Sequence, residues 1–170
     1  MTRTELDMDT VRKLVDGDLP WKELASDLLP NPKDKDRFQK VRQAYEERVD
    51  WNDPILMPLN DHLFVVGTEN GRKIKTACGE VLCDANANWK KSCQVRVRED
   101  QDELAELYGP EQTPAWSFQL REFMCPQCYE LVEVESLPSA YPVVRRFKPD
   151  IDEFYEEWLD EPAPDADLAQ

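Results

Sequence analysis

Two pairs of cysteines constrain this chain more than any other feature of its sequence. Cys78 and Cys83 enclose four residues, Cys125 and Cys128 enclose two, and 41 residues separate the two pairs. A short turn can present two sulfurs to one ion, and Zn²⁺ prefers a tetrahedral set of thiolate or imidazole ligands. The spacing therefore predicts a zinc site formed by all four cysteines. Four protein ligands leave no open position for substrate, so the ion would stabilise the fold rather than perform chemistry.

Disulfide bonds and redox chemistry are the alternatives for these four thiols. The chain opens without the apolar stretch of a signal peptide, which favours a cytoplasmic location and a reducing environment. Clustered thiols in such an environment bind metal more often than they pair. A thioredoxin-like motif would open a helix, whereas the residues after Cys128 follow a strand pattern. Zinc binding is the favoured interpretation, and the other two stay open.

The remaining cysteine and the single histidine are not expected to bind the metal. Cys93 alternates with Val95 and Val97, which places all three on the buried face of a predicted strand. Cys93 is then a small core residue. His62 has no partner at ligand spacing, and we expect it at the surface or at a strand edge.

The charge of the chain restricts its partners. The 170 residues carry a formal net charge of −15 at pH 7. Such a chain is repelled by nucleic acid phosphates and by anionic membrane surfaces, so neither is expected as a partner. The length suits one domain with helical extensions.

The order of the hydrophobic patterns predicts an α+β fold in four parts. They are an N-terminal helical segment over 1–50, a zinc-binding β-rich core over 51–148, an amphipathic helix over 149–160 and an acidic tail over 161–170. Glu69, Asn70 and Gly71 separate two strand patterns and predict a hairpin that places Cys78 at the end of its second strand. The sheet is expected to be small and antiparallel, with a zinc-ribbon-like site of four cysteines at its strand ends.

Individual elements follow from the same patterns. Helices are predicted near 11–15, 21–28, 34–49 and 102–108, and strands over 63–68, 72–77, 91–98, 115–124 and 130–134.

An acidic segment with an apolar stripe begins at Pro149. It holds nine Asp or Glu and no Lys or Arg. Its apolar residues recur at helical spacing: Ile151, Phe154, Tyr155, Trp158 and Leu159. The stripe could pack on the core of this chain or dock on another subunit, and the sequence favours neither. The tail that follows is expected to be disordered or to lie on the surface.

No catalytic motif is visible in the sequence. It lacks a glycine-rich phosphate loop and a nucleophile with a base at recognisable spacing. A single histidine also leaves few general bases near neutral pH. We therefore expect no catalytic residues.

Six segments together resemble the gamma subunit of acetone carboxylase and its ketone carboxylase relatives. They are PKDKDRF (32–38), WNDPILMPL (51–59), LFVV (63–66), CGEVLCDANANWK (78–90), TPAWSFQLREFMCPQC (113–128) and YPVVRRFKPDIDEFYEEWL (141–159). The resemblance implies a small, non-catalytic, zinc-binding subunit of a heterohexamer, assembled with alpha and beta subunits. Those larger subunits would use ATP, hold Mn²⁺ and convert acetone and bicarbonate to acetoacetate. The zinc ligands implied for this chain are again Cys78, Cys83, Cys125 and Cys128.

The sequence departs from the family pattern at two positions near the thiols. Thr76 stands where a further cysteine is frequent, and Tyr129 stands where a glycine commonly follows the second pair. A free-standing zinc ribbon of the transcription or nucleic-acid machinery is the alternative function. It would require a basic stripe, which the acidic composition does not supply. A thiol oxidoreductase, with zinc-free dithiol chemistry at Cys125 and Cys128, is the third possibility.

Overall fold

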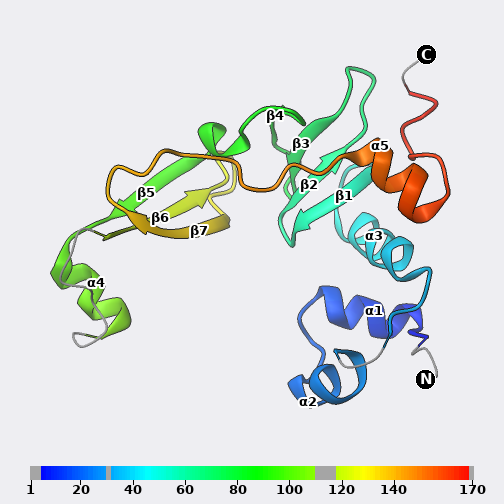
Figure 1. Cartoon of the computed structure of the whole chain (residues 1–170), viewed down its shortest axis with the longest axis horizontal. Helices are drawn as coiled ribbons and strands as arrows, with labels where there is room; N and C mark the ends of the chain where they lie inside the picture. Colours follow the sequence, from blue (N-terminus) through cyan, green and yellow to red (C-terminus); the bar gives the residue numbers. More distant parts are fainter. Residues whose placement is uncertain (1–4, 30–31, 110–117, 169–170) are drawn as a thin grey trace.

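The computed structural model describes residues 5–29, 32–109 and 118–168 and contains two antiparallel sheets flanked by helices (Figure 1). This arrangement confirms the predicted α+β class. The helical elements are α1 (Met8–Val15), α2 (Trp21–Glu23), η1 (Leu24–Leu28), α3 (Arg37–Arg48), η2 (Trp89–Ser92), α4 (Gln101–Tyr108), α5 (Ile151–Glu153) and η3 (Phe154–Leu159). The strands are β1 (Ile55–Asn60), β2 (Leu63–Val66), β3 (Lys73–Thr76), β4 (Val81–Asp84), β5 (Gln94–Arg98), β6 (Phe118–Met124) and β7 (Leu131–Pro138).

The N-terminal helices form where the sequence predicts them. The Asp7 side chain caps α1 by accepting a hydrogen bond from the Thr10 backbone at 2.8 Å. Arg12 of α1 reaches Glu47 of α3 at 2.8 Å, which ties the two helices together. Their apolar faces pack on one side of the larger sheet (Figure 1). The helices therefore cover one face of the larger sheet.

The larger sheet has the strand order β1-β2-β3-β4, and all its neighbours are antiparallel. All four residues of β2 are buried. Phe64 and Val66 face the helical side, while Leu63 and Val65 face the second apolar cluster, which also contains residues of the smaller sheet. Burial on both faces explains why this strand reads as a continuous apolar run. The hairpin predicted from Asn70 and Gly71 joins β2 to β3 as expected.

The smaller sheet has the order β5-β6-β7. Val95 pairs with Phe123 of the central strand β6, yet Val95 is 43% exposed and Val97 is 47% exposed. The prediction that these two valines are buried is therefore wrong. They belong to an edge strand, and the core cluster covers only the region around Phe123. Cys93 precedes β5 and does pack against that cluster, as predicted.

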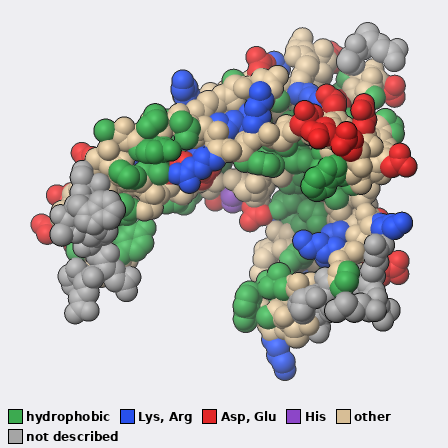
Figure 2. All heavy atoms as spheres, in the orientation of Figure 1, with side chains coloured by type: hydrophobic (Ala, Val, Ile, Leu, Met, Phe, Trp, Pro, Cys, Tyr) green, Lys and Arg blue, Asp and Glu red, His purple; other side chains and the backbone are tan. Residues whose placement is uncertain are grey.

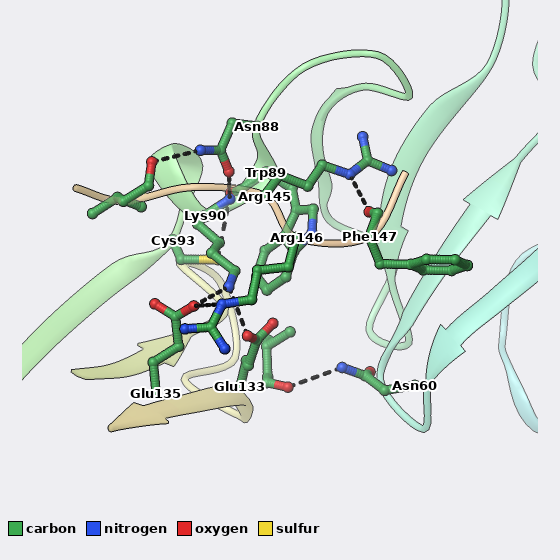
Figure 3. Close-up of polar contacts among 12 residues, drawn as sticks. Asn60, Asn88, Trp89, Lys90, Cys93, Glu133, Glu135, Arg145, Arg146 and Phe147 are labelled. Atoms are coloured by element: carbon green, nitrogen blue, oxygen red, sulfur yellow. Dashed lines mark hydrogen bonds and ion pairs between the residues drawn. The ribbon is translucent and has the colours of Figure 1, made fainter. Parts of the chain in front are cut away.

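A buried lysine stabilises the junction between the two sheets (Figure 3). The Lys90 side chain is 2% exposed, and its Nζ lies 2.6 Å from carboxylate oxygens of both Glu133 and Glu135 on β7. Its ammonium also lies over the Phe123 ring, 5.3 Å from the centroid. Nearby, the Asn60 side chain of β1 donates to the Val132 carbonyl of β7 at 3.0 Å. These contacts connect η2 and β1 to the smaller sheet.

Residues 139–150 run from β7 back to the larger sheet (Figure 1). The Asn88 side chain donates to the Val143 carbonyl at 3.0 Å (Figure 3). Arg145 donates to the Ala87 carbonyl, also at 3.0 Å. Arg121 of β6 also donates to the Tyr141 carbonyl. Hydrogen bonds therefore hold this segment to β6 of the smaller sheet and to the residues that follow β4 of the larger sheet.

The apolar stripe of α5 and η3 packs on the core of this chain. Tyr155 is buried and donates from its hydroxyl to the Leu56 carbonyl at 2.9 Å, while Phe154 meets Phe38 edge to face at 4.8 Å. Trp158 is the exception, because it is 77% exposed. Figure 2 shows acidic side chains gathered over the outer side of this helical segment.

Residues 161–168 lie against the larger sheet. Asp165 is buried and pairs with Arg72 at 2.7 Å. Of the two alternatives for the acidic tail, the structure shows the surface-bound one over these residues. Among the helices of the described residues, none has both the length and the apolar character needed to cross a membrane.

The turn between β6 and β7 contains an unusual backbone conformation. Tyr129 has φ 62°, in the left-handed region where a Cβ is strained. Its backbone N–H donates to the Cys125 carbonyl at 3.0 Å, and the Cys125 N–H donates to the Glu130 carbonyl at 2.9 Å. A glycine at this position would adopt the same backbone conformation without that strain.

Replacing Tyr129 with glycine is expected to stabilise the fold. Tyr129 is exposed, so the loss of buried contacts is small, and release of the left-handed strain contributes about 1 kcal/mol. Urea unfolding of Tyr129→Gly should give a higher midpoint than wild type. Tyr108→Gly, at a similarly exposed helical residue, should instead lower it by about 1 kcal/mol. A lower midpoint for Tyr129→Gly would contradict the strain argument.

Replacing Lys90 with methionine is expected to lower the free energy of unfolding by about 3–5 kcal/mol. The substitution leaves the buried carboxylate of Glu135 without its closest cation. Lys73→Met breaks an ion pair with the exposed Asp84 and should cost less than about 1 kcal/mol. Denaturant unfolding of the wild type and the two variants measures both changes in the free energy of unfolding. Similar losses in the two variants would mean that the Lys90 pair contributes no more than a surface pair.

Candidate metal centre

Three of the four predicted ligands meet where two hairpin turns touch. Cys78 lies in the turn between β3 and β4, and Cys125 and Cys128 lie in the turn between β6 and β7. Their three sulfur atoms are all within 4.8 Å of one another, and Cys78 Sγ lies 3.6 Å from Cys125 Sγ. A tetrahedral zinc site with Zn–S bonds of about 2.3 Å has sulfurs roughly 3.8 Å apart. The spacing of the three thiols therefore fits such an ion.

Backbone hydrogen bonds hold the first turn in place. The Thr76 N–H donates to the Glu80 carbonyl and the Gly79 N–H donates to the Thr76 carbonyl, each at 2.9 Å. Gly79 has φ 97°, and a Cβ there would lie 3.4 Å from the Trp51 ring. Glycine is thus required directly after Cys78 for the turn to close. The turn presents the Cys78 sulfur toward the other hairpin.

The surroundings of Cys78 favour its thiolate. Burial raises the pKa of Cys78, but hydrogen bonding to the Thr76 hydroxyl and the Glu80 backbone outweighs it, and the pKa falls below its ordinary value. The Thr76 Oγ1 lies 3.2 Å from the Cys78 sulfur. Thr76 is thus a neighbour of the site that spacing alone did not identify.

The pKa of Cys128 shifts in the opposite direction to that of Cys78. Burial and the neighbouring Cys78 and Cys125 thiols raise the pKa of Cys128 to about 11. Three adjacent sulfurs do not ionise together easily, because each thiolate repels the next. A divalent cation would offset that repulsion and allow all three to bind as thiolates.

Cys83 lies apart from the other three thiols. It is half-buried on β4, where it pairs with Ile74 and packs against the core. Among the described residues, the group of mutually close ligand atoms contains Cys78, Cys125 and Cys128 but not Cys83. The expected four-cysteine set is therefore not assembled here. The reason is geometric: Cys78 lies in the turn, and Cys83 lies well along the outgoing strand, which advances about 3.3 Å per residue.

His62 lies nearer to the thiols than the sequence suggested. It borders the same pocket of about 250 Å³ as Cys78, Cys125 and Cys128. Strand register could have revealed this, because Leu63 pairs with Thr76 and the preceding residue then falls beside the β3–β4 turn. Cys93, by contrast, is a core residue as expected: burial raises its pKa to about 12, and its sulfur lies 3.6 Å from the Trp89 carbonyl.

Comparison with known proteins identifies the family of the chain. The family model for the acetone carboxylase gamma subunit matches residues 49–159, which include both sheets and all five cysteines. The chain is also 39% identical to the acetone carboxylase gamma subunit of Xanthobacter autotrophicus over 155 residues, covering 89% of this chain and 92% of that protein. The chain therefore belongs to the acetone carboxylase gamma subunit family.

Proposed function

We propose that this chain is the structural, zinc-binding gamma subunit of an ATP-dependent acetone carboxylase. In this proposal it assembles with alpha and beta subunits into a heterohexamer in the cytoplasm. The partner subunits hold ATP and Mn²⁺ and convert acetone and bicarbonate to acetoacetate. Family membership supports the assignment, and the observation that carries the zinc-binding role is the three-thiol cluster between two hairpin turns.

The position of the thiols supports a structural role for the metal. Cys78 belongs to a hairpin of the larger sheet, whereas Cys125 and Cys128 belong to a hairpin of the smaller sheet. An ion bound to all three would link the sheets at their turns. Such a link reduces the conformational freedom of the unfolded chain and adds the metal-binding free energy to folding.

Exposed apolar side chains on the smaller sheet support the contact with a larger subunit. Val95 and Val97 stand on the same face of β5, and neither is covered by the core cluster. Apolar groups gathered on a surface mark interaction sites more often than isolated ones. We assign the β5 surface, defined by these two valines, to a larger subunit of the carboxylase.

The zinc-binding role predicts one Zn²⁺ per chain. Cys78→Ser and Cys125→Ser should lose the metal and lower the melting temperature by about 10 °C, since a lost structural site removes several kcal/mol from a domain of this size. Cys93→Ala is the control, because it trims a half-buried side chain outside the thiol group. It should keep the zinc and cost about 1 kcal/mol. Metal analysis and thermal unfolding of the full chain give both quantities. A zinc-free chain that melts as high as the metal-loaded one would contradict the proposal.

The subunit role predicts that the larger subunits need this chain to assemble. They would be expressed with the full chain, with a Val95→Lys/Val97→Lys variant, or alone. The hexamer yield and acetone-dependent ATP hydrolysis should be highest with the full chain and fall at least about tenfold in the other two cases. Val81→Lys/Val134→Lys, at comparably exposed valines, is the matched control and should assemble normally.

The outcomes separate two parts of that proposal. If the larger subunits assemble and turn over equally well alone, the subunit role is wrong. If only the Val95→Lys/Val97→Lys variant assembles normally, the role stands and the assignment of the β5 surface is wrong.

A further inference from the structure

The thiol cluster provides three of the four ligands that a closed zinc site requires. The pocket around the three sulfurs contains other polar side chains, and these are His62, Thr76 and Glu130. A threonine hydroxyl is a poor zinc ligand, whereas imidazole and carboxylate both bind the ion. The fourth ligand is therefore to be sought at His62 or Glu130.

The backbone of His62 is fixed beside the first thiol-bearing turn. Its carbonyl accepts a hydrogen bond from the Ala77 N–H at 3.0 Å, and its N–H donates to the Asn60 side chain at 2.9 Å. Ala77 directly precedes Cys78. The register of the β2–β3 hairpin thus holds the backbones of His62 and Cys78 close to each other.

The ring of His62 has the carboxylate neighbour that metal-binding imidazoles commonly have. Its Nε2 lies 3.7 Å from Glu130 Oε1, and the residue is only half-buried. In metal sites the nitrogen that does not bind the ion usually donates to a carboxylate or carbonyl, which orients the ring. Glu130 can serve in this way and leave Nδ1 for the metal.

We propose that His62, and not Cys83, is the fourth zinc ligand, so that the site is Cys78, Cys125, Cys128 and His62. The inference rests on the proposed zinc-binding role. The ring nitrogens lie outside the group of mutually close sulfurs, so binding requires a rotation of the His62 side chain into the adjoining pocket. A neutral imidazole leaves one net negative charge on the zinc centre, whereas a fourth thiolate would leave two. The smaller charge suits a chain that already carries −15.

One spectroscopic experiment tests the ligand directly, because His62 is the single histidine of the chain. The full chain would be labelled with ¹⁵N-histidine and loaded with ¹¹³Cd²⁺ in place of zinc. We expect scalar coupling between cadmium and one imidazole nitrogen, in the wild type and equally in Cys83→Ser. Bound cadmium without that coupling would overturn the assignment to His62. A wild-type chain that binds neither zinc nor cadmium would instead overturn the proposed zinc-binding role.

Substitutions give a second, independent test through zinc affinity. His62→Ala should weaken zinc binding at least about tenfold, and His62→Cys should restore much of it by supplying a thiolate from the same position. Cys83→Ser is the matched control and should stay within about threefold of wild type. A loss in Cys83→Ser that equals the loss in His62→Ala, or no loss in His62→Ala, would overturn the proposal. Competition with a chelator of known affinity measures all four proteins.

Discussion

The contact between two hairpin turns is the constraint on which the rest of this structure depends. Sheets as small as these, one of three strands and one of four, need a packed apolar face to be stable. Here the two sheets share one apolar cluster, in which Phe123 of one sheet and Leu63 of the other take part. Cys78 and Cys125 bring the turns to within 3.6 Å at the edge of that cluster. The contact between the two turns thus closes one edge of the core that the two sheets share.

A second joint, of different chemistry, lies at Lys90 beside the shared cluster. There Lys90 is surrounded by Glu133, Glu135 and the Phe123 ring (Figure 3). The Arg146 side chain also lies 3.6 Å from Glu135. A buried ion pair contributes modest net stability but penalises any other arrangement, because each displaced charge would be left unpaired. The apolar contacts therefore supply most of the stability, while the ion pairs tie η2, and through Arg146 the segment after β7, to β7.

Local patterns in the sequence predicted more of this fold than of its site. The Asn70-Gly71 hairpin and the helix over 151–159 follow from turn chemistry and periodicity, which depend on neighbouring residues alone. β1 was not predicted, because Pro58 and two bulges interrupt its pattern. The valines of β5 alternate like core residues. They are exposed because the shared cluster does not extend to them. Likewise, spacing grouped Cys83 with Cys78, whereas strand register placed His62 beside the thiols and Cys83 along β4.

The path of the chain through β1 has a consequence for the order of folding. The Leu56 carbonyl receives its hydrogen bond from Tyr155, 99 residues later, and Arg72 pairs with Asp165, 93 residues later. Contacts between residues so far apart in sequence form slowly, because a long loop must close first. During synthesis, part of one apolar face of the larger sheet therefore stays uncovered until residues 151–165 have left the ribosome. Over that interval the nascent chain is most exposed to misassembly, and a chaperone would have most to protect.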